Sequence, residues 1–298
     1  MMTIKEGYMP FQGSKTYYRI TGEPSELPPL ILLHGGPGST HNYFELLDPL
    51  AETGRQIIMY DQTGCGNSWW DGSSDRFTKE TWIEELDALR KHLGITKCHL
   101  LGQSWGGMLA LLYMLDRKPE DVCSVILSST LASASLWSRE LHRLLKGLTK
   151  EEQVSIRYAE ITGNYSDTGY VAANDRFMRM HCSDFGSKAP ECLRREKKTG
   201  TEAYLTAWGP NEYTPTGNLK DYELTDRLKE LDVPALIISG TEDLCTPVVA
   251  KSMYDAIPGS RWELFAGAKH MCFAEQPRRY MRLLDEWMSA HDGNEAEE

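Results

Sequence analysis

Residues 102–107 read Gly-Gln-Ser-Trp-Gly-Gly, and they lie between a short apolar run, Cys98–Leu101, and a strongly apolar helical pattern, Trp105–Arg117. A G-x-S-x-G pattern between a strand and a helix predicts a tight turn that projects the serine hydroxyl above the sheet. Glycines on both sides of the serine relieve the crowding of such a turn. The N–H groups at the start of the next helix favour developing negative charge. A chance match in a loop rarely has this context, so we predict that Ser104 is a nucleophile.

The sequence on both sides of this turn alternates between strand and helix patterns. Apolar runs predict strands at 29–34, 56–61, 98–101, 122–128, 234–239 and 261–265. Helical periodicity predicts helices at 78–93 and 105–117, after Pro247, and over 276–291. This alternation is typical of an α/β protein with a mainly parallel, doubly wound sheet.

The stretch from Leu131 to Lys229 interrupts this alternation, because it contains helical patterns and no convincing buried strand. Thr149 and Glu152 have the spacing of a capping box, which predicts a helix that runs through Glu160. We therefore predict two units: a core formed by residues 1–130 and 230–298, and an inserted helical cap at 131–229.

A serine nucleophile needs a general base and an acid that orients this base. In enzymes built around such a strand–turn–helix, the acid and then the histidine follow the serine in the chain. The sequence Gly-Thr-Glu-Asp at 240–243 follows the predicted strand 234–239, so Glu242 and Asp243 are both placed to be the acid. His270 lies between the strand that ends at Phe265 and the last helix, which suits the base.

Acyl transfer also needs two backbone N–H groups that bind the oxyanion. One is expected from Trp105, which follows the nucleophile directly. The other is expected from the glycine-rich turn His-Gly-Gly-Pro-Gly at 34–38, where we choose Gly36. This turn lacks the patterns of phosphate loops and of dinucleotide sites, so a nucleotide cofactor is poorly supported.

The motifs HGGPG (34–38), DQTGCGNS (61–68) and GQSWGG (102–107) together resemble the proline iminopeptidases and their relatives, the tricorn-associated aminopeptidases and the L-amino acid amidases. The resemblance extends to GPNE (209–212), GTED (240–243) and AKH (268–270). It implies an α/β-hydrolase fold with a helical cap, and hydrolysis of the amide bond after an N-terminal amino acid through an acyl-enzyme. It also favours Asp243 over Glu242 as the acid.

The resemblance further implies that Glu212 binds the positively charged amine of the substrate. Burying that charge without a counter-charge costs several kcal/mol. Tricorn-type relatives carry a second glutamate directly after the acid of the triad, where this chain has Leu244. Leu244→Glu is therefore expected to improve binding of amine substrates. The same departure leaves a second function open, that of an esterase or amidase acting on a small metabolite without a free amine.

A binding protein on a hydrolase scaffold is a third possibility, which the intact set of Ser104, Asp243, His270 and HGGPG opposes.

Cys245 and Cys272 lie two residues after the acid and the base, so bulky thiol reagents are expected to block the site through them, with Cys65 as the next candidate. Eight aromatic residues near the motifs are candidates for the acyl pocket: Tyr43, Trp69, Trp70, Trp105, Trp137, Tyr204, Trp208 and Tyr213.

Charge and composition exclude several other classes. The net charge of −11 argues against nucleic acid or an anionic membrane as partner. No apolar run approaches the ~20 residues of a membrane span, and the N-terminus lacks a signal core. The seven cysteines lack disulfide or zinc spacing, so we expect no metal, no cofactor and a cytoplasmic location. The expected partner is a small-molecule or short-peptide substrate.

Overall fold

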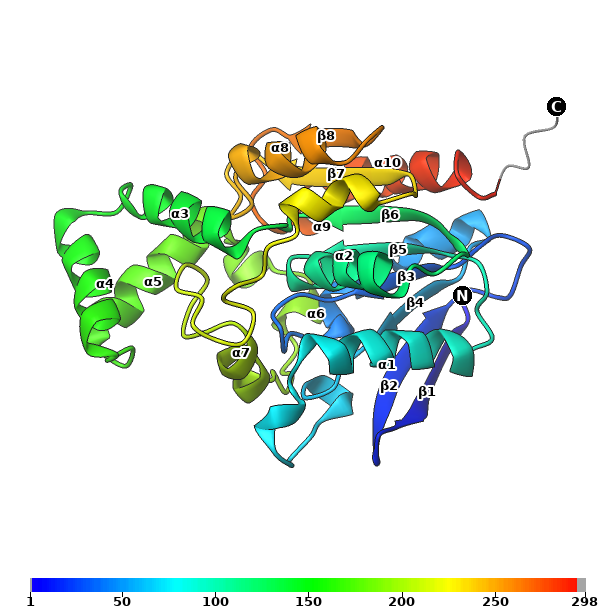
Figure 1. Cartoon of the computed structure of the whole chain (residues 1–298), viewed down its shortest axis with the longest axis horizontal. Coiled ribbons are helices and arrows are strands. Elements are labelled where there is room, and N and C mark those ends of the chain that lie inside the picture. The colour runs from blue at the N-terminus through cyan, green and yellow to red at the C-terminus, as the bar shows by residue number, and fades with distance from the viewer. Residues whose placement is uncertain (1, 294–298) are drawn as a thin grey trace.

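The computed structural model describes residues 2–293, and these residues form an eight-stranded sheet with helices on both faces (Figure 1). The strands are β1 (Ile4–Phe11), β2 (Ser14–Thr21), β3 (Leu30–Leu33), β4 (Ile57–Tyr60), β5 (Cys98–Gln103), β6 (Val122–Ser128), β7 (Ala235–Gly240) and β8 (Arg261–Phe265). Their spatial order is β1-β2-β4-β3-β5-β6-β7-β8, and all neighbours from β4 to β8 are parallel. The prediction of a mainly parallel, doubly wound sheet is confirmed.

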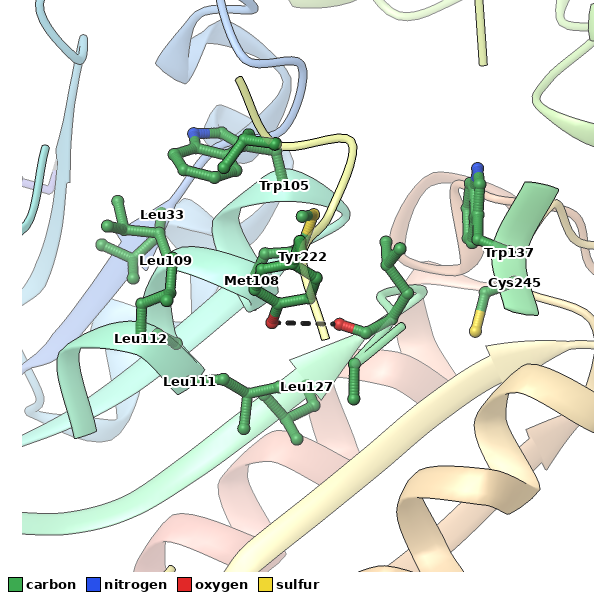
Figure 2. Close-up of a cluster of buried hydrophobic side chains, with 14 of the residues drawn as sticks. Leu33, Trp105, Met108, Leu109, Leu111, Leu112, Leu127, Trp137, Tyr222 and Cys245 are labelled. Carbon is green, nitrogen blue, oxygen red and sulfur yellow. Dashed lines mark hydrogen bonds between the residues drawn. The ribbon is translucent and has the colours of Figure 1, made fainter. Parts of the chain in front are cut away.

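Two apolar cores lie on the two faces of the sheet. Alternate residues of β3 divide between them, with Ile31 and Leu33 in one core and Leu30 and Leu32 in the other. The first core contains α1 (Lys79–His92), α2 (Trp105–Arg117) and α8 (Pro247–Ala256), and Figure 2 shows the part around α2. The second contains the 3₁₀ helix η1 (His41–Thr53) and α10 (Pro277–Ser289). The central strands are therefore buried on both sides, which explains their continuous apolar sequences.

Helices α3 (Ala134–Leu145), α4 (Lys150–Thr162) and α5 (Thr168–His181), which follow β6, extend beyond one end of the sheet, on the left in Figure 1. The same insertion contains the 3₁₀ helix η4 (Gly186–Lys188), α6 (Glu191–Arg194) and α7 (Thr201–Ala207). Its last element, the 3₁₀ helix η5 (Thr225–Glu230), packs against α2 and α8 instead. Thr149 and Glu152 form the capping box of α4, and Gly163 ends this helix in a left-handed conformation. The remaining short elements are η2 (Gly66–Ser68), η3 (Ser74–Arg76) and α9 (Cys272–Glu275).

The hairpin of β1 and β2 is an element that the sequence patterns did not predict. β1 pairs antiparallel with β2, and β2 pairs antiparallel with β4. β1 lies at the edge of the sheet, and most of its side chains are exposed or only partly buried. It therefore has no continuous apolar run of the kind that marks the central strands.

Candidate active site

Ser104 lies in the turn between β5 and α2, in a backbone conformation that few residues adopt. Its φ of 55° and ψ of −123° place it outside the regions normally allowed for a side chain of this kind. The turn is tight, because a Cβ on Gly106 would lie 1.9 Å from the carbonyl oxygen of Leu33 and one on Gly102 would lie 2.1 Å from that of Gly106. These two positions therefore need glycine, as the G-x-S-x-G pattern implied.

Asp243 and His270 are joined across 27 residues of sequence. Nδ1 of His270 lies 2.7 Å from Oδ1 of Asp243. The carboxylate also accepts hydrogen bonds from Ser129 Oγ at 2.7 Å, Cys245 N at 2.8 Å and Gly240 N at 3.1 Å. With four partners at a buried site, this carboxylate is held as an acceptor of the His270 ring proton.

Burial alone would lower the pKa of His270, but the charge and hydrogen bond of Asp243 outweigh it, so that the pKa is raised. The competing acid, Glu242, has an exposed side chain, and its backbone oxygen accepts from His181 Nδ1 instead. The geometry thus brings Asp243, and not Glu242, to His270.

A cavity of about 740 Å³ contains most of the predicted site residues in its wall, namely Ser104, His270, Gly36 and Glu212. Among the described residues, no hydrogen bond joins the Ser104 hydroxyl to the His270 ring. Catalytic hydrogen bonds often form or shorten only when substrate binds, so the absence of this contact does not oppose proton transfer.

Within the described part of the chain, the backbone N–H groups of the two predicted oxyanion donors, Gly36 and Trp105, have no hydrogen-bond partner. Trp105 is the first residue of α2, so its N–H has no partner within the helix. The N–H of Gly36 makes no hydrogen bond among residues 2–293. The neighbouring Gly35 N–H donates instead to Tyr43 Oη at 2.6 Å, and Tyr43 donates to Gln103 Oε1 at 2.9 Å. This chain links the glycine turn to the residue before the nucleophile.

Glu212 lies in the cavity wall and is partly buried as a whole residue. Tyr204 Oη donates to Glu212 Oε1 at 2.9 Å, and the indole N–H groups of Trp137 and Trp208 donate to its backbone oxygen. Burial raises the pKa of Glu212, while the His270 charge and the Tyr204 hydrogen bond oppose this rise. A cationic group beside this carboxylate would therefore be stabilised.

Leu244 is fully buried in the first apolar core and does not line the cavity. We therefore expect Leu244→Glu to place its carboxylate in the core and not to improve amine binding. Of the eight aromatic candidates, Tyr43 and Tyr204 are the two that line the cavity within the described part of the chain.

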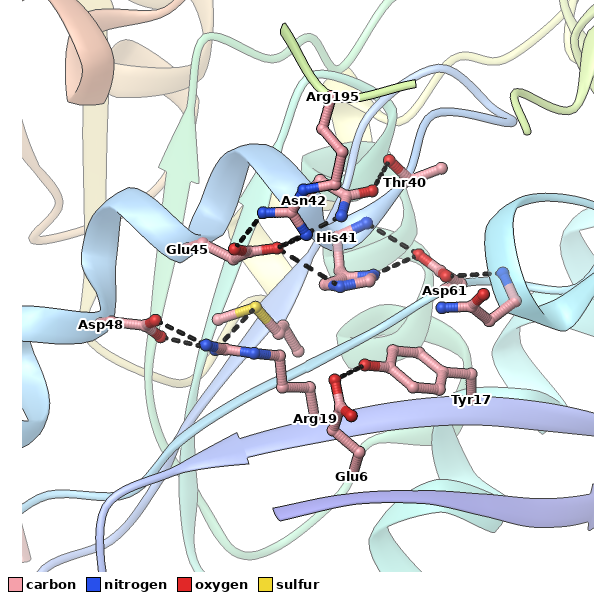
Figure 3. Close-up of polar contacts among 12 residues, drawn as sticks. Glu6, Tyr17, Arg19, Thr40, His41, Asn42, Glu45, Asp48, Asp61 and Arg195 are labelled. Atoms are coloured by element: carbon pink, nitrogen blue, oxygen red, sulfur yellow. Dashed lines mark hydrogen bonds and ion pairs between the residues drawn. The ribbon is translucent and has the colours of Figure 1, made fainter. Parts of the chain in front are cut away.

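The DQTGCGNS motif lies outside the cavity wall. Asp61 is fully buried, and it accepts hydrogen bonds from the backbone N–H and Nδ1 of His41 and from the N–H of Asn67 (Figure 3). Burial would raise the pKa of Asp61, but the hydrogen bond and charge of His41 lower it. Asp61 therefore joins its own loop to the start of η1 at His41.

Sequence reasoning missed three residues in or beside the cavity: Gln103 and Cys182, which line it, and Gln62. The signal for Gln62 and Gln103 was their place within the recognised motifs. Across residues 2–293 the structure contains no cluster of histidine, cysteine and acidic side chains suited to a metal ion. Nor is any helix in that range long and apolar enough to cross a membrane.

A family model described as alpha/beta hydrolase fold matches residues 28–277. A proline iminopeptidase of Lactobacillus helveticus is 61% identical over 293 residues, which cover 98% of this chain and 100% of the relative. The chain belongs to the proline iminopeptidase family of α/β-hydrolases. The crystal structure of a proline iminopeptidase from Mycobacterium smegmatis matches with a TM-score of 0.85 and 32% identity, over 97% of this chain and 99% of that one. The crystal structure of VinJ has a TM-score of 0.89 and 31% identity, over 96% and 99%. The resemblance in the motifs and the prediction of a hydrolase are thus confirmed.

Proposed function

We propose that this chain is an aminopeptidase that releases an N-terminal amino acid, above all proline, from short peptides by serine catalysis. The observation that carries the proposal is one cavity in which Ser104, Glu212 and the Asp243-bound His270 meet. The names of relatives up to 61% identical over nearly the full chain support the choice of proline.

Ser104 Oγ attacks the carbonyl carbon of the first residue, and Nε2 of His270 takes the hydroxyl proton. Asp243 holds the ring so that Nδ1 carries a proton and Nε2 is the base. The N–H groups of Gly36 and Trp105 stabilise the oxyanion. His270 then donates its proton to the leaving amine, which departs. A water molecule takes the place of the amine and attacks the acyl carbon while His270 accepts its proton. His270 returns this proton to Ser104 Oγ as the acid is released.

Glu212 supplies the specificity for a free N-terminus in this proposal. The charged amine of the substrate pairs with its carboxylate, which Tyr204 orients. A carboxylate whose pKa is raised by burial gains more from such a cation than an exposed one, because water screens the pair less. Residues 131–229 act as the cap that carries this glutamate and closes the site over the substrate.

A panel of matched substrates tests this function. Prolyl p-nitroanilide is expected to be hydrolysed and its N-acetyl derivative is expected to resist. Glu212→Gln is expected to lower kcat/KM for the free amine by on the order of 10²-fold and to affect an uncharged ester far less. Asp184→Asn, which alters another acid in the cavity wall, serves as the control. Equal turnover of acetylated and free substrates would refute the aminopeptidase.

An esterase or amidase acting on a small metabolite without an amine is the second candidate, because Leu244 stands where tricorn-type relatives carry a second glutamate. In that case Ser104 would still be the nucleophile. Glu212→Gln would then have the same effect, harmful or neutral, on charged and on uncharged substrates. A fluorophosphonate probe separates both enzymes from a binding protein, since it labels Ser104 only where the serine is activated.

We infer a cytoplasmic location from the cysteines. All seven are free thiols, and five of them are buried. Free thiols persist in a reducing compartment. Fractionation of the source cells with detection of the chain tests this inference.

A further inference from the structure

The cavity wall carries charges of both signs. Glu212 and Asp184 are its acids, and Arg179 and Lys197 are its cations besides the histidine. Arg179 is ion-paired with Asp175. Lys197 is partly buried, and its ammonium group makes no ion pair or hydrogen bond with any residue from 2 to 293. Glu45 is the acid that influences it, through space and without contact.

The other cations of residues 194–198, the segment that contains Lys197, have partners. Arg195 forms ion pairs with Glu45 at 2.8 Å and with Glu191 at 2.7 Å, the first of which is drawn in Figure 3. The ammonium group of Lys198 lies 3.4 Å from the centre of the Trp69 ring. Arg194 donates to the carbonyl oxygen of Ala189 at 2.8 Å. Lys197 is thus the one cation of residues 194–198 that lines the cavity, and its ammonium group has no ion-pair or hydrogen-bond partner among the described residues.

The segment is held against both glycine-rich motifs. The N–H of Gly200 donates to the carbonyl oxygen of Gly38 at 2.7 Å, and the carbonyl oxygen of Lys198 accepts from the N–H of Gly66 at 2.7 Å. Lys197 is therefore anchored beside the turn that contains Gly36. Glu212 has different charged and polar neighbours, namely His270 and Tyr204. The two opposite charges mark separate parts of one cavity.

From this arrangement we propose that Lys197 binds the C-terminal carboxylate of the leaving portion of a short peptide. The proposal rests on the proposed aminopeptidase function and narrows its substrate class to short peptides with a free C-terminus. A dipeptide or tripeptide carries an amine at one end and a carboxylate at the other. Glu212 and Lys197 match those two charges, with Ser104 acting on the bond between them.

Partial burial makes an unpaired ammonium group costly, and a carboxylate beside it offsets that cost. Burial and the nearby Arg195 lower the pKa of Lys197, and a bound carboxylate would oppose this shift. An amide or anilide leaving group offers no such charge. Discrimination between a peptide acid and its amide is thus the direct measure of this contact.

The experiment compares Pro-Ala, Pro-Ala-Ala, their C-terminal amides and prolyl p-nitroanilide on the full chain. The unmodified enzyme is expected to favour at least one acid over its amide by about 10-fold in kcat/KM, mainly through KM. Lys197→Met should abolish that preference and leave the amides and the anilide within about twofold. Lys198→Met is the matched control, since the neighbouring lysine stacks on Trp69, and it should retain the preference.

Equal turnover of acids and amides by the unmodified enzyme would overturn the proposal, as would an acid preference that survives in Lys197→Met. A uniform loss on all substrates in Lys197→Met would also overturn it, because that pattern indicates a displaced segment. Prolyl p-nitroanilide, which has no carboxylate, distinguishes a failure of the aminopeptidase proposal from a failure of the carboxylate subsite. If the anilide is hydrolysed and the acid preference is absent, the aminopeptidase stands and the carboxylate subsite fails.

Discussion

The indole N–H of Trp105 donates a hydrogen bond to Oε1 of Gln62 at 2.7 Å, across 43 residues of sequence. The other end of the same amide, Nε2, donates to the carbonyl oxygen of His34 at 2.9 Å. Burial lowers the pKa of His34 to about 4, so its ring is neutral at pH 7 and Nε2 accepts from the Gln62 N–H at 3.0 Å. Gln62 therefore ties together the two loops that carry the oxyanion donors.

Gln62→Met is expected to lower kcat by about 10- to 100-fold with KM nearly unchanged, because the two N–H groups lose their mutual alignment. Steady-state kinetics on prolyl p-nitroanilide measure kcat and KM separately. A boronate analogue of the transition state should lose affinity by a similar factor. Gln56→Met, at a glutamine that contacts Gly22 far from the site, should change neither quantity. A rise in KM alone in Gln62→Met would contradict the role.

Asp243→Asn is expected to lower kcat by roughly 10⁴-fold with folding intact, because an amide favours the wrong tautomer of His270. Glu242→Gln, on the exposed neighbour, should retain nearly full activity. Kinetics and circular dichroism of both variants test the assignment. A crippled Glu242→Gln beside an active Asp243→Asn would reverse it.

Leu244→Glu is expected to destabilise the protein by about 3 kcal/mol or more, because it places an unpaired carboxylate in a core without exposure. Leu244→Met conserves volume and should cost less than about 1.5 kcal/mol. Urea unfolding of both variants gives the difference. A stable Leu244→Glu with a lower KM for amines would mean that the side chain reaches the cavity.

Glu85 should make stability depend on pH. It is fully buried and accepts from Thr16 Oγ1 at 2.5 Å and from Thr63 N at 2.9 Å, and burial raises its pKa to about 7. Because the folded pKa lies above the unfolded value, the folded state holds a proton that the unfolded chain releases. The stabilisation that this proton gives to the folded state is complete below pH ~4.5 and is lost as pH rises through 7.

The free energy of unfolding should therefore fall by on the order of 3 kcal/mol between pH 4.5 and 8 relative to Glu85→Gln, which cannot titrate. Urea unfolding of both proteins across this range measures the relative change. If the two proteins show parallel pH profiles, the buried proton is absent.

Thiol reagents are expected to act at Cys182. Cys65, Cys245 and Cys272 have no exposed surface, whereas Cys182 is partly exposed and lines the cavity. Inhibition by p-chloromercuribenzoate should therefore disappear in Cys182→Ser and persist in the Cys245→Ser, Cys272→Ser double variant. Burial raises the pKa of Cys182 to about 12, so alkylation by iodoacetamide, which needs the thiolate, should be slow at pH 7 and accelerate with pH.

The sequence by itself determined those features that depend on neighbours along the chain. Gly102 and Gly106 specify the turn at Ser104 because no Cβ fits there, and continuous apolar runs mark β3 to β7 because both of their faces are buried. The capping box at Thr149 and the bounds of α2 follow from local hydrogen bonding and helical periodicity.

Only the tertiary structure decided which distant residues meet. The convergence of loops from several strands brings Gln62 to Trp105 and Tyr204 to Glu212. It also places Glu212, Lys197 and Ser104 in the wall of one cavity. Leu244 shows the limit most directly. It adjoins the predicted acid Asp243, yet its side chain enters the core while Asp243 faces His270. Adjacent side chains in a turn point in different directions, and packing of the whole fold selects the direction of each.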